Sequence, residues 1–393
     1  MAGMFSWLAR DRVPSQVKSS LASRAFMIAP GQPVWSRRDA SKFAEEGYRR
    51  NVVAHRAVNM IATAAGSVPW KLKEHKARSS RFIEQHPLLN LIHRPNPLQG
   101  GTELCEALVA YRLISGNAYL HAVGPKGDAP LELHVLRPDR VAILPGQGGM
   151  PKAYRYSIDQ RSVDMAVDPV TGQSRVLHLK YFHPLDDWYG LSPMEAAAYS
   201  IDQHNQCSAW NQALLQNGAR PSGALMVKTP EGQSGNLSES QYTRLRQQLE
   251  EQFSGSQNAG RPLLLEGGLE WRDMSLSPRD MDFIAVKHSS ARDIALAFGV
   301  PPQLLGIPGD NTYANLQEAR LALWEQTILP LLEQLTDALN NWLVPMFDTS
   351  LELVPDQDTI PVLSAKRDAY WDRISTADFL SDTEKRRLLG VGV

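Results

Sequence analysis

The sequence lacks the motifs that mark the best-known classes of enzyme. Among 393 residues there are only two cysteines, Cys105 and Cys207, which argues against a disulfide framework and favours a reducing compartment. There is no GxxxxGK[ST] phosphate loop, no GxSxG, no HExxH and no CxxC pair. No apolar run reaches the roughly 20 residues that a membrane-spanning helix needs. We therefore expect a soluble chain made in the cytoplasm, without a cofactor and without a membrane partner.

One short segment could supply half of a metal site. His183, Asp186 and Asp187 lie in the sequence YFHPLDDWYG, and their side chains are possible ligands for a divalent cation. Such a site would make the chain a cytosolic metal-dependent α/β enzyme, using the segment from His183 to Asp187. In a proline-containing loop these residue types are more often turn and capping residues. We keep the enzyme as the alternative function; it predicts bound metal and loss of activity on Asp187→Ala.

The net charge of −1 hides an asymmetry along the chain. The first hundred residues hold 16 Lys or Arg and 6 Asp or Glu, a net charge of +10, and the remainder carries −11. Between Val300 and Asp358 the single Lys or Arg is Arg320, against nine acids. The basic part suits an acidic partner. The second half, by contrast, would not bind its partner through Lys or Arg side chains. A chance distribution over solvated surfaces is the alternative for both.

The spacing of apolar residues predicts a mixed chain with an inserted unit. Residues 41–65 and 102–114 repeat at helical spacing, and five short segments between 118 and 181 alternate at strand spacing. Ser192 caps a long helix that Gly218 ends. From Gln203 onward that helix carries small residues and amides but no charge, which favours packing against protein or lining a passage. Residues 220–276 then predict a small βαββ unit, followed by a second helix.

The helical pattern breaks abruptly after Phe298, in the sequence FGVPPQLLGIPGDNTYANLQ. Three prolines and three glycines between 299 and 309 exclude a continuous helix or strand. The segment nevertheless carries several apolar side chains, so we expect this loop to contact another surface. A long amphipathic helix follows from Tyr313 to Val344, and Pro330 should kink it because proline removes a hydrogen bond. A strand and two short helical stretches complete the chain.

This order of parts resembles the portal proteins of tailed bacteriophages, in particular the compact type of long-tailed phages and gene transfer agents. The sequence blocks that carry the resemblance lie in order between Tyr189 and Asn340. They are YGLSPMEAAAYSI, QNGARPSGAL, NAGRPLLLEGGLEW, SLSPRDMDFI, IALAFGVPPQLLG, and NTYANLQEAR with TILPLLEQLTDALN. LRPDRVAIL fits the same family further upstream, so the resemblance extends from about residue 40. Each block is weakly specific, but the ordered set is strongly specific.

The resemblance implies an α+β fold, the phage portal fold, with a mixed α/β wing, a two-helix stem, a small α/β clip, a long kinked helix and a short helical crown. The implied boundaries are the N-terminal arm at 1–38, the wing at 39–190, stem helix 1 at 191–219, the clip at 220–276, stem helix 2 at 277–298, the tunnel loop at 299–313, the kinked helix and wing return at 314–354, and the crown at 355–393.

The implied function is a dodecameric ring at one capsid vertex, which forms the channel for packaging and ejection of double-stranded DNA. Its implied partners are further copies of the chain, the large terminase, the major capsid protein and a head–tail adaptor. The ATPase is a separate terminase, which agrees with the missing phosphate loop. The implied location is the virion, after assembly in the bacterial host cytoplasm. The basic arm before Arg38 is then expected to contact capsid, scaffold or packaged DNA.

Three sets of candidate site residues follow from the resemblance. The tunnel-loop residues expected to face DNA are Gln303, Leu304, Leu305, Ile307, Asp310, Asn311 and Thr312. The stem and channel candidates are Gln203, Asn205, Gln212, Lys287 and Arg292. The clip candidates for contact with terminase or adaptor are Arg244, Arg246, Gln247, Glu250 and Glu251. A lining without rows of Lys and Arg suits DNA that slides, because each phosphate contact adds salt-dependent affinity. The alternatives are that the loop packs on the next subunit and that the uncharged helix forms a subunit seam.

Overall fold

A computed structural model describes most of the chain. The described residues are 40–76, 79–125, 128–146, 149–216, 223–227, 239–240, 243–244, 247, 269–273, 283–309 and 313–389. All of them belong to one compact unit, Ser36–Val393. The expected N-terminal arm at 1–38 lies outside them.

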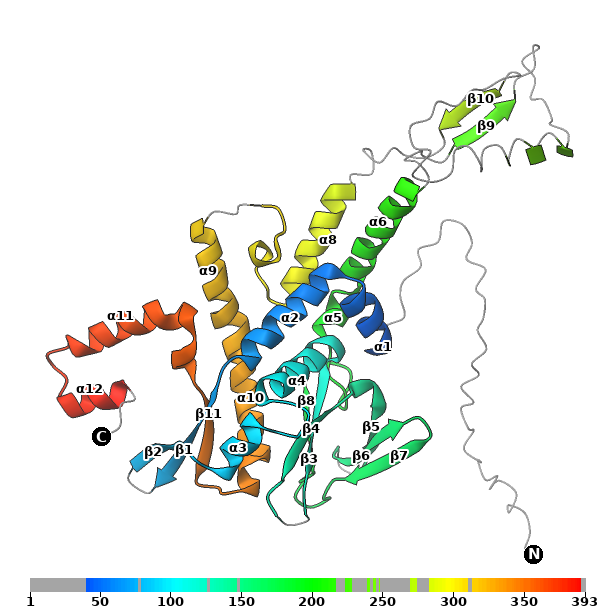
Figure 1. Ribbon diagram of the computed structural model, residues 1–393. Coiled ribbons are helices and arrows are strands. Elements are labelled where there is room, and N and C mark those ends of the chain that lie inside the picture. Colours follow the sequence, from blue (N-terminus) through cyan, green and yellow to red (C-terminus); the bar gives the residue numbers. More distant parts are fainter. Residues whose placement is uncertain are drawn as a thin grey trace, which may run out of the picture. The chain divides into compact units, whose positions relative to one another are not determined.

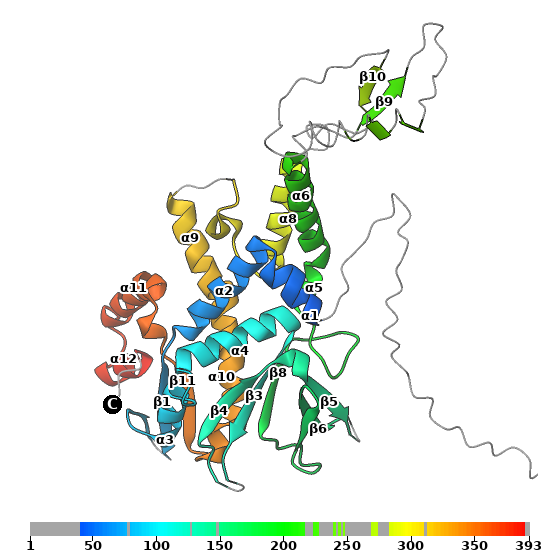
Figure 2. The same cartoon turned by 45° about the vertical axis from the view of Figure 1, so that its right-hand side comes forward.

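Two helices form the centre of the main core. After the short helical segments α1 (Ala40–Lys42) and η1 (Phe43–Arg49), α2 (Val52–Gly66) packs on α4 (Gly101–Ser115). The Asn51 side chain caps α2 by accepting hydrogen bonds from the N–H groups of Val53 and Ala54, at 3.1 and 3.0 Å. An amide oxygen at this position satisfies N–H groups that the first turn of a helix leaves free. Figure 2 shows α4 crossing over the strands of the neighbouring sheet.

The described residues also form three antiparallel three-stranded sheets. The first has the order β4-β3-β8, from Glu132–Leu136, Asn117–Val123 and Val176–Lys180. The second has the order β5-β6-β7, from Val141–Pro145, Pro151–Ile158 and Arg161–Ala166. The third has the order β11-β1-β2, from Leu351–Pro355, Trp70–Lys76 and Ser79–Ile83, and α3 (Pro87–His93) follows it. In the third sheet β11, from late in the sequence, pairs with β1 of the early β1–β2 hairpin.

A close backbone approach fixes the end of α4. Gly116 adopts φ +77°, and a Cβ there would lie 2.2 Å from the carbonyl oxygen of Gly190. Only glycine fits this position, since other residues disfavour the left-handed region and the carbonyl leaves no room. This contact places the segment before α5 directly against the end of α4.

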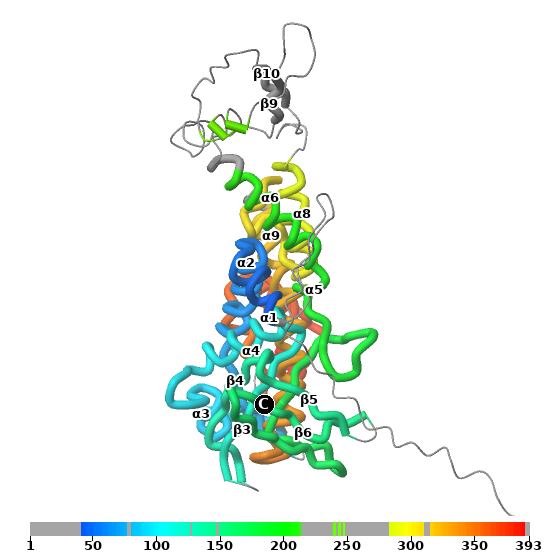
Figure 3. The backbone as a smooth tube through the Cα atoms, turned by 90° about the vertical axis from the view of Figure 1, so that its right-hand side faces the viewer, coloured from blue at the N-terminus to red at the C-terminus, as the bar shows by residue number. Residues whose placement is uncertain are grey.

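Two antiparallel helices then leave the core together. Ser192 caps α5 (Pro193–Ala196) by accepting a hydrogen bond from the N–H of Met194, as the sequence predicted. α6 (Ala198–Gln216) and α8 (Phe283–Ala297) lie side by side in Figures 1 and 3. Between them in sequence, β9 (Gly223–Val227) pairs antiparallel with β10 (Leu269–Asp273). That two-stranded ribbon is the part of the expected clip for which strands are described.

The long helix after the loop is continuous but contains a wide turn. It consists of α9 (Tyr313–Leu323), the π-helical turn η5 (Trp324–Ile328) and α10 (Leu329–Trp342). The N–H of Leu329 donates to the carbonyl of Trp324, five residues back. Pro330, at the second position of α10, has no N–H and would crowd a carbonyl in a regular α-turn. The distortion expected at the proline is therefore a π turn just before it.

The end of the chain contrasts with this core. After η6 (Val344–Met346), β11 and two 3-10 turns, η7 (Gln357–Thr359) and η8 (Pro361–Leu363), come α11 (Ser364–Ser375) and α12 (Asp382–Leu388). Neither α11 nor α12 has a buried residue.

Candidate functional site

The base of α6 is held by a buried polar cluster. The Asn51 amide nitrogen lies 3.2 Å from Nδ1 of His204 and donates to Oδ1 of Asn205 at 3.0 Å. Asn205 in turn donates to the carbonyl of Glu46 at 2.9 Å. Burial, together with the nearby Lys287 ammonium, lowers the pKa of His204, so the imidazole is neutral and can accept the hydrogen bond. Asn205, expected at the channel, instead uses its amide inside the chain to fix α6 on η1 and α2.

The other stem candidates lie on α6 and α8 in different environments. Gln203 and Gln212 are exposed, and the Gln203 side-chain oxygen accepts a hydrogen bond from Ser290 at 3.2 Å across the helix pair. Lys287 is half-buried on α8. Arg292 is exposed and donates to the carbonyl of Pro308. Arg292 thus contacts the loop, whereas the two glutamines lie on the surface of α6.

The loop after α8 is anchored by burial at two points. Val300 is 2% exposed and Ile307 is 6% exposed, and both belong to the main core. Leu304 and Leu305, in the 3-10 turn η4 (Pro302–Leu305), are half-buried and pack against the same core, and Gln303 is also half-buried. Among the described loop residues, the exposed ones are Gly299 at the start and Gly306, Pro308 and Gly309 at the tip.

The burial of Ile307 corrects one expectation. Its side chain was expected to face DNA, but an apolar side chain next to the core gains free energy by leaving water, and the loop folds back to bury it. Asp310, Asn311 and Thr312, also expected to face DNA, lie outside the described residues.

A threonine that the sequence did not single out positions the start of the loop. The Thr327 hydroxyl, in the π turn, donates to the carbonyl of Gly299 at 2.7 Å. Gly299 has φ +65°, and a Cβ there would lie 2.7 Å from that same hydroxyl oxygen. The positions of Gly299 and Pro330 were the available signals in the sequence. Neither could identify the partner, because the contact joins residues 28 apart across a loop.

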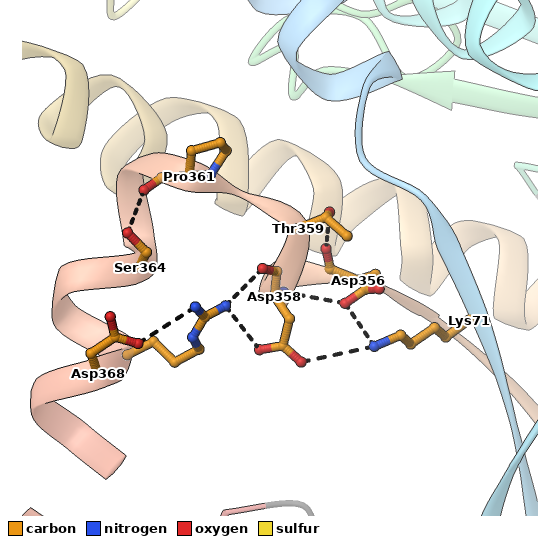
Figure 4. A network of polar contacts seen from close by, with 8 residues as sticks. Lys71, Asp356, Asp358, Thr359, Pro361, Ser364 and Asp368 are labelled. Atoms are coloured by element: carbon orange, nitrogen blue, oxygen red, sulfur yellow. Dashed lines mark hydrogen bonds and ion pairs between the residues drawn. The ribbon is translucent and has the colours of Figure 1, made fainter. Parts of the chain in front are cut away.

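Charges from the two halves of the chain meet at the C-terminal segment. In Figure 4, Lys71 Nζ lies 2.8 Å from Asp356 Oδ1 and 3.8 Å from Asp358 Oδ2. Arg367 donates to the Asp358 carbonyl at 2.7 Å. On the same strand as Lys71, His75 Nε2 lies 2.6 Å from Glu352. Part of the charge asymmetry is therefore satisfied within the chain, where basic β1 pairs with acidic β11 and the turns after it.

Two of the candidates in the expected clip lie at the surface. Arg244 and Gln247 are exposed. Arg246, Glu250 and Glu251 lie outside the described residues.

The segment from His183 to Asp187 forms turns. His183 Nδ1 accepts from the N–H of Leu185 at 3.1 Å, and Asp186 accepts from the N–H groups of Trp188 and Tyr189 at 2.7 and 3.1 Å. Those N–H groups lower the pKa of Asp186. Asp187 uses its carbonyl to accept from Lys180. Within the described residues no three His, Cys, Asp or Glu side chains are grouped to hold a metal ion. The metal-enzyme alternative gains no support.

The two thiols are poor nucleophiles. Burial raises the pKa of Cys105 to about 12 and also raises that of Cys207, so both are protonated at neutral pH. Among the helices that are described, none combines the length and the apolar character needed to cross a membrane.

Comparison with known proteins agrees with this architecture. Residues 52–390 match the model of the family described as phage portal protein. The chain belongs to the phage portal protein family. The predicted resemblance and the predicted α+β portal fold are confirmed.

Relatives and solved structures cover most of the chain. An uncharacterised protein of Rickettsia bellii is 48% identical, over 88% of each chain. The solved neck of an empty gene transfer agent particle, computed with C6 symmetry, contains a chain that is 49% identical, with a TM-score of 0.70 and coverage of 92% of this chain and 96% of that one. The neck of the native particle, computed with C12 symmetry, gives 48% identity and a TM-score of 0.67 at the same coverage.

Proposed function

We propose that this chain is the subunit of a portal ring, which forms the channel for packaging and ejection of double-stranded DNA in a phage or gene transfer agent particle. The observation that carries the proposal is the likeness, over 92% of this chain, to a chain from the neck of a gene transfer agent particle. The C12 symmetry of the native neck supports a dodecamer. The ring sits at one capsid vertex, at the head–tail junction of the virion, after assembly in the bacterial host cytoplasm.

The parts of the fold fit the parts of such a subunit. The three sheets with α2 to α4 correspond to the wing at 39–190, and β11 returns to it from the long helix. α6 and α8 correspond to the stem, the segment 220–276 to the clip, 299–313 to the tunnel loop and 355–393 to the crown.

The surfaces that would face DNA avoid rows of cations. α6 exposes the uncharged Gln203 and Gln212, and α9 and α10 expose the carboxylates of Glu318, Glu333 and Asp337. Such a surface lets a polyanion slide, because few phosphate contacts form that would have to break at each step. Lys287 and Arg292 remain stem candidates.

In the tunnel loop, the DNA-facing part is the exposed tip at Gly306, Pro308 and Gly309, flanked by Gln303, Leu304 and Leu305. Asp310, Asn311 and Thr312 continue this tip in sequence and remain DNA-facing candidates. Ile307 is left out because it is buried.

The partners follow from the same assignment. The large terminase and the head–tail adaptor contact the clip, through Arg244, Arg246, Gln247, Glu250 and Glu251. The major capsid protein contacts the wing, and the basic arm at 1–38 contacts capsid, scaffold or packaged DNA. The chain itself catalyses no reaction, and ATP hydrolysis belongs to the terminase.

The experiment that tests the ring is the mass of the purified protein in solution. Light scattering should give a species about twelve times the 43.7 kDa chain, or a neighbouring ring number. A monomer at every concentration would contradict the proposal.

The DNA-channel role is tested separately, in particles. Pro308→Lys, at the exposed loop tip, should reduce the DNA content of particles without changing ring mass. The matched control is Pro345→Lys, at an exposed proline outside the loop. Equal DNA content in both variants would count against a DNA-facing tip.

A further inference from the structure

The π turn η5 contacts two segments that lie far apart in the sequence. On one side, the Thr327 hydroxyl donates to the carbonyl of Gly299 at the start of the loop. On the other side, the Glu325 carboxylate accepts a hydrogen bond from Lys366 on α11. The two contacting residues are two positions apart in the same five-residue turn.

The turn is fixed on its inner face. Ile328 is fully buried, Trp324 packs against the main core, and η5 contacts α2. Its i→i−5 hydrogen bond, from Leu329 to Trp324, accommodates the missing N–H of Pro330. A π turn holds one residue more than an α turn, so conversion to an α turn would rotate the side chains by about 100°. Glu325 and Thr327 could not both keep their partners after such a rotation, so the positions of both side chains depend on the same turn.

The two segments that the turn joins are held differently. The loop is anchored to the core by Val300 and Ile307, whereas α11 has no buried residue. The contacts from α11 to the body include the partly exposed pairs of Lys366 with Glu325 and Arg367 with Asp358. Partly exposed ion pairs are weak, so α11 is the end that a force or a partner can displace.

We propose that η5 is a mechanical link that sets the position of loop 299–309 according to the position of α11, with Thr327 as the positioning residue. When α11 is displaced, Glu325 loses Lys366, the turn shifts, and Thr327 releases Gly299. The importance of the loop for DNA passage rests on the proposed function. The link itself is a property of one chain and can be measured without DNA or particles.

The probe is a thiol that becomes reactive only when the loop lifts. Val300→Cys replaces a side chain that is 2% exposed by one of similar size. Its rate of alkylation in purified full-length protein, resolved by mass spectrometry, reports the open population of the loop. The native Cys105, buried on α4, is an internal control that reacts only on wider unfolding.

Thr327→Val removes the hydroxyl at nearly constant volume, and should raise labelling of the Val300→Cys thiol about fivefold, the effect of losing one hydrogen bond. Thr327→Ser keeps the donor and should label at the unmodified rate. Labelling of Cys105 should stay constant in both. An unchanged rate for Thr327→Val, or a parallel rise at Cys105, would overturn the assignment of Thr327.

The coupling to α11 is tested by charge reversal. Lys366→Glu should raise loop labelling about threefold, because it places two carboxylates together at an exposed site. The combined exchange Glu325→Lys with Lys366→Glu should restore the original rate. Arg373→Glu, the same change of sign on the same helix, should have no effect, because Arg373 lies over Tyr370 and has no ion pair within the part of the chain that is described.

The decisive comparison is the double variant. If η5 is one link, Lys366→Glu should add nothing further once Thr327→Val has already released the loop. Independent, multiplying effects would overturn the link, as would a charge exchange that fails to restore labelling. These outcomes do not depend on ring formation, so a failure of the proposed function would be recognised separately, by particle DNA content and ring mass.

Discussion

The loop at 299–309 and the C-terminal helices α11 and α12 are held on the rest of the chain by opposite means. The loop buries Val300 and Ile307 in the main core and exposes Gly306, Pro308 and Gly309 at its tip. The two helices bury no residue, and their contacts with the body include the ion pairs of Lys366 and Arg367. Apolar burial is insensitive to salt, whereas exposed ion pairs weaken with ionic strength. The loop therefore has a buried base with an exposed tip, and the C-terminal helices are the part that high salt can detach.

The largest effect should come from a charge placed at the base of the loop. Ile307→Lys forces an ammonium into the core and should lower the free energy of unfolding by about 3 kcal/mol or more. Pro308→Lys, one residue further and exposed, should change it by less than about 0.5 kcal/mol. Urea denaturation of both variants measures the difference. Similar values would mean that burial does not anchor the loop.

The pH dependence of the free energy of unfolding also distinguishes buried from exposed groups, because a buried imidazole responds to pH differently from an exposed charge. His178 stacks on Tyr119 with ring centroids 4.5 Å apart, and burial lowers its pKa from 6.5 to about 3. The unfolded chain binds this proton first, so the contribution of His178 is present above pH 6.5 and is lost as the pH falls from there towards about 3.

The slope from this group is at most about 1.4 kcal/mol per pH unit. His178→Gln should flatten the fall in stability between pH 6 and pH 4 by part of that slope, as followed by chemical denaturation at each pH. The same slope in both proteins would show that His178 does not bind a proton in this range on unfolding.

Backbone strain at the loop entrance should give an intermediate effect. Gly299→Ala places a Cβ at positive φ and 2.7 Å from the Thr327 hydroxyl, and should cost about 1–2 kcal/mol. Gly309→Ala, in the same loop, meets only the end of the Arg292 side chain at 3.4 Å, and should cost less than about 0.5 kcal/mol. Thermal or urea denaturation compares the two. Equal costs would remove the special role of Gly299.

The smallest effect on stability, but the clearest dependence on salt, is expected at the ion pairs that hold α11. Arg367→Gln removes the cation that joins α11 to Asp358, and should change the free energy of unfolding by less than about 1 kcal/mol. It should still speed proteolysis within α11 at low salt, with the difference from the unmodified protein disappearing near 1 M salt. Arg373→Gln is the control on the same helix. If the rate of proteolysis depends neither on salt nor on Arg367, α11 is held by other contacts.

Much of the fold could be predicted because its signals are local or ordered along the chain. The Ser192 cap lies beside the helix it begins, and the ordered sequence blocks identified the portal fold. The Asp186 turn follows from its neighbours Trp188 and Tyr189, and so it was predictable as a turn residue. Each of these depends on residues that are close together in the sequence.

The contacts that position the candidate site could not be predicted in this way. Thr327 meets Gly299 across 28 residues, and Lys71 meets Asp356 only because β11 returns to β1. Pro330 predicted a distortion, but whether it becomes a kink or a π turn depends on packing against α2. Ile307 was assigned to the channel because the resemblance implies a tunnel loop at this place, and the sequence does not show that this loop folds back onto the core.

The central claim is that twelve such chains, or a close number, surround a channel. Electron-microscopy class averages of the purified protein, viewed down the ring axis, test it most directly. The account predicts closed rings with a central hole wide enough for duplex DNA. Monomers or compact assemblies without a hole, over a wide range of concentration and salt, would contradict it.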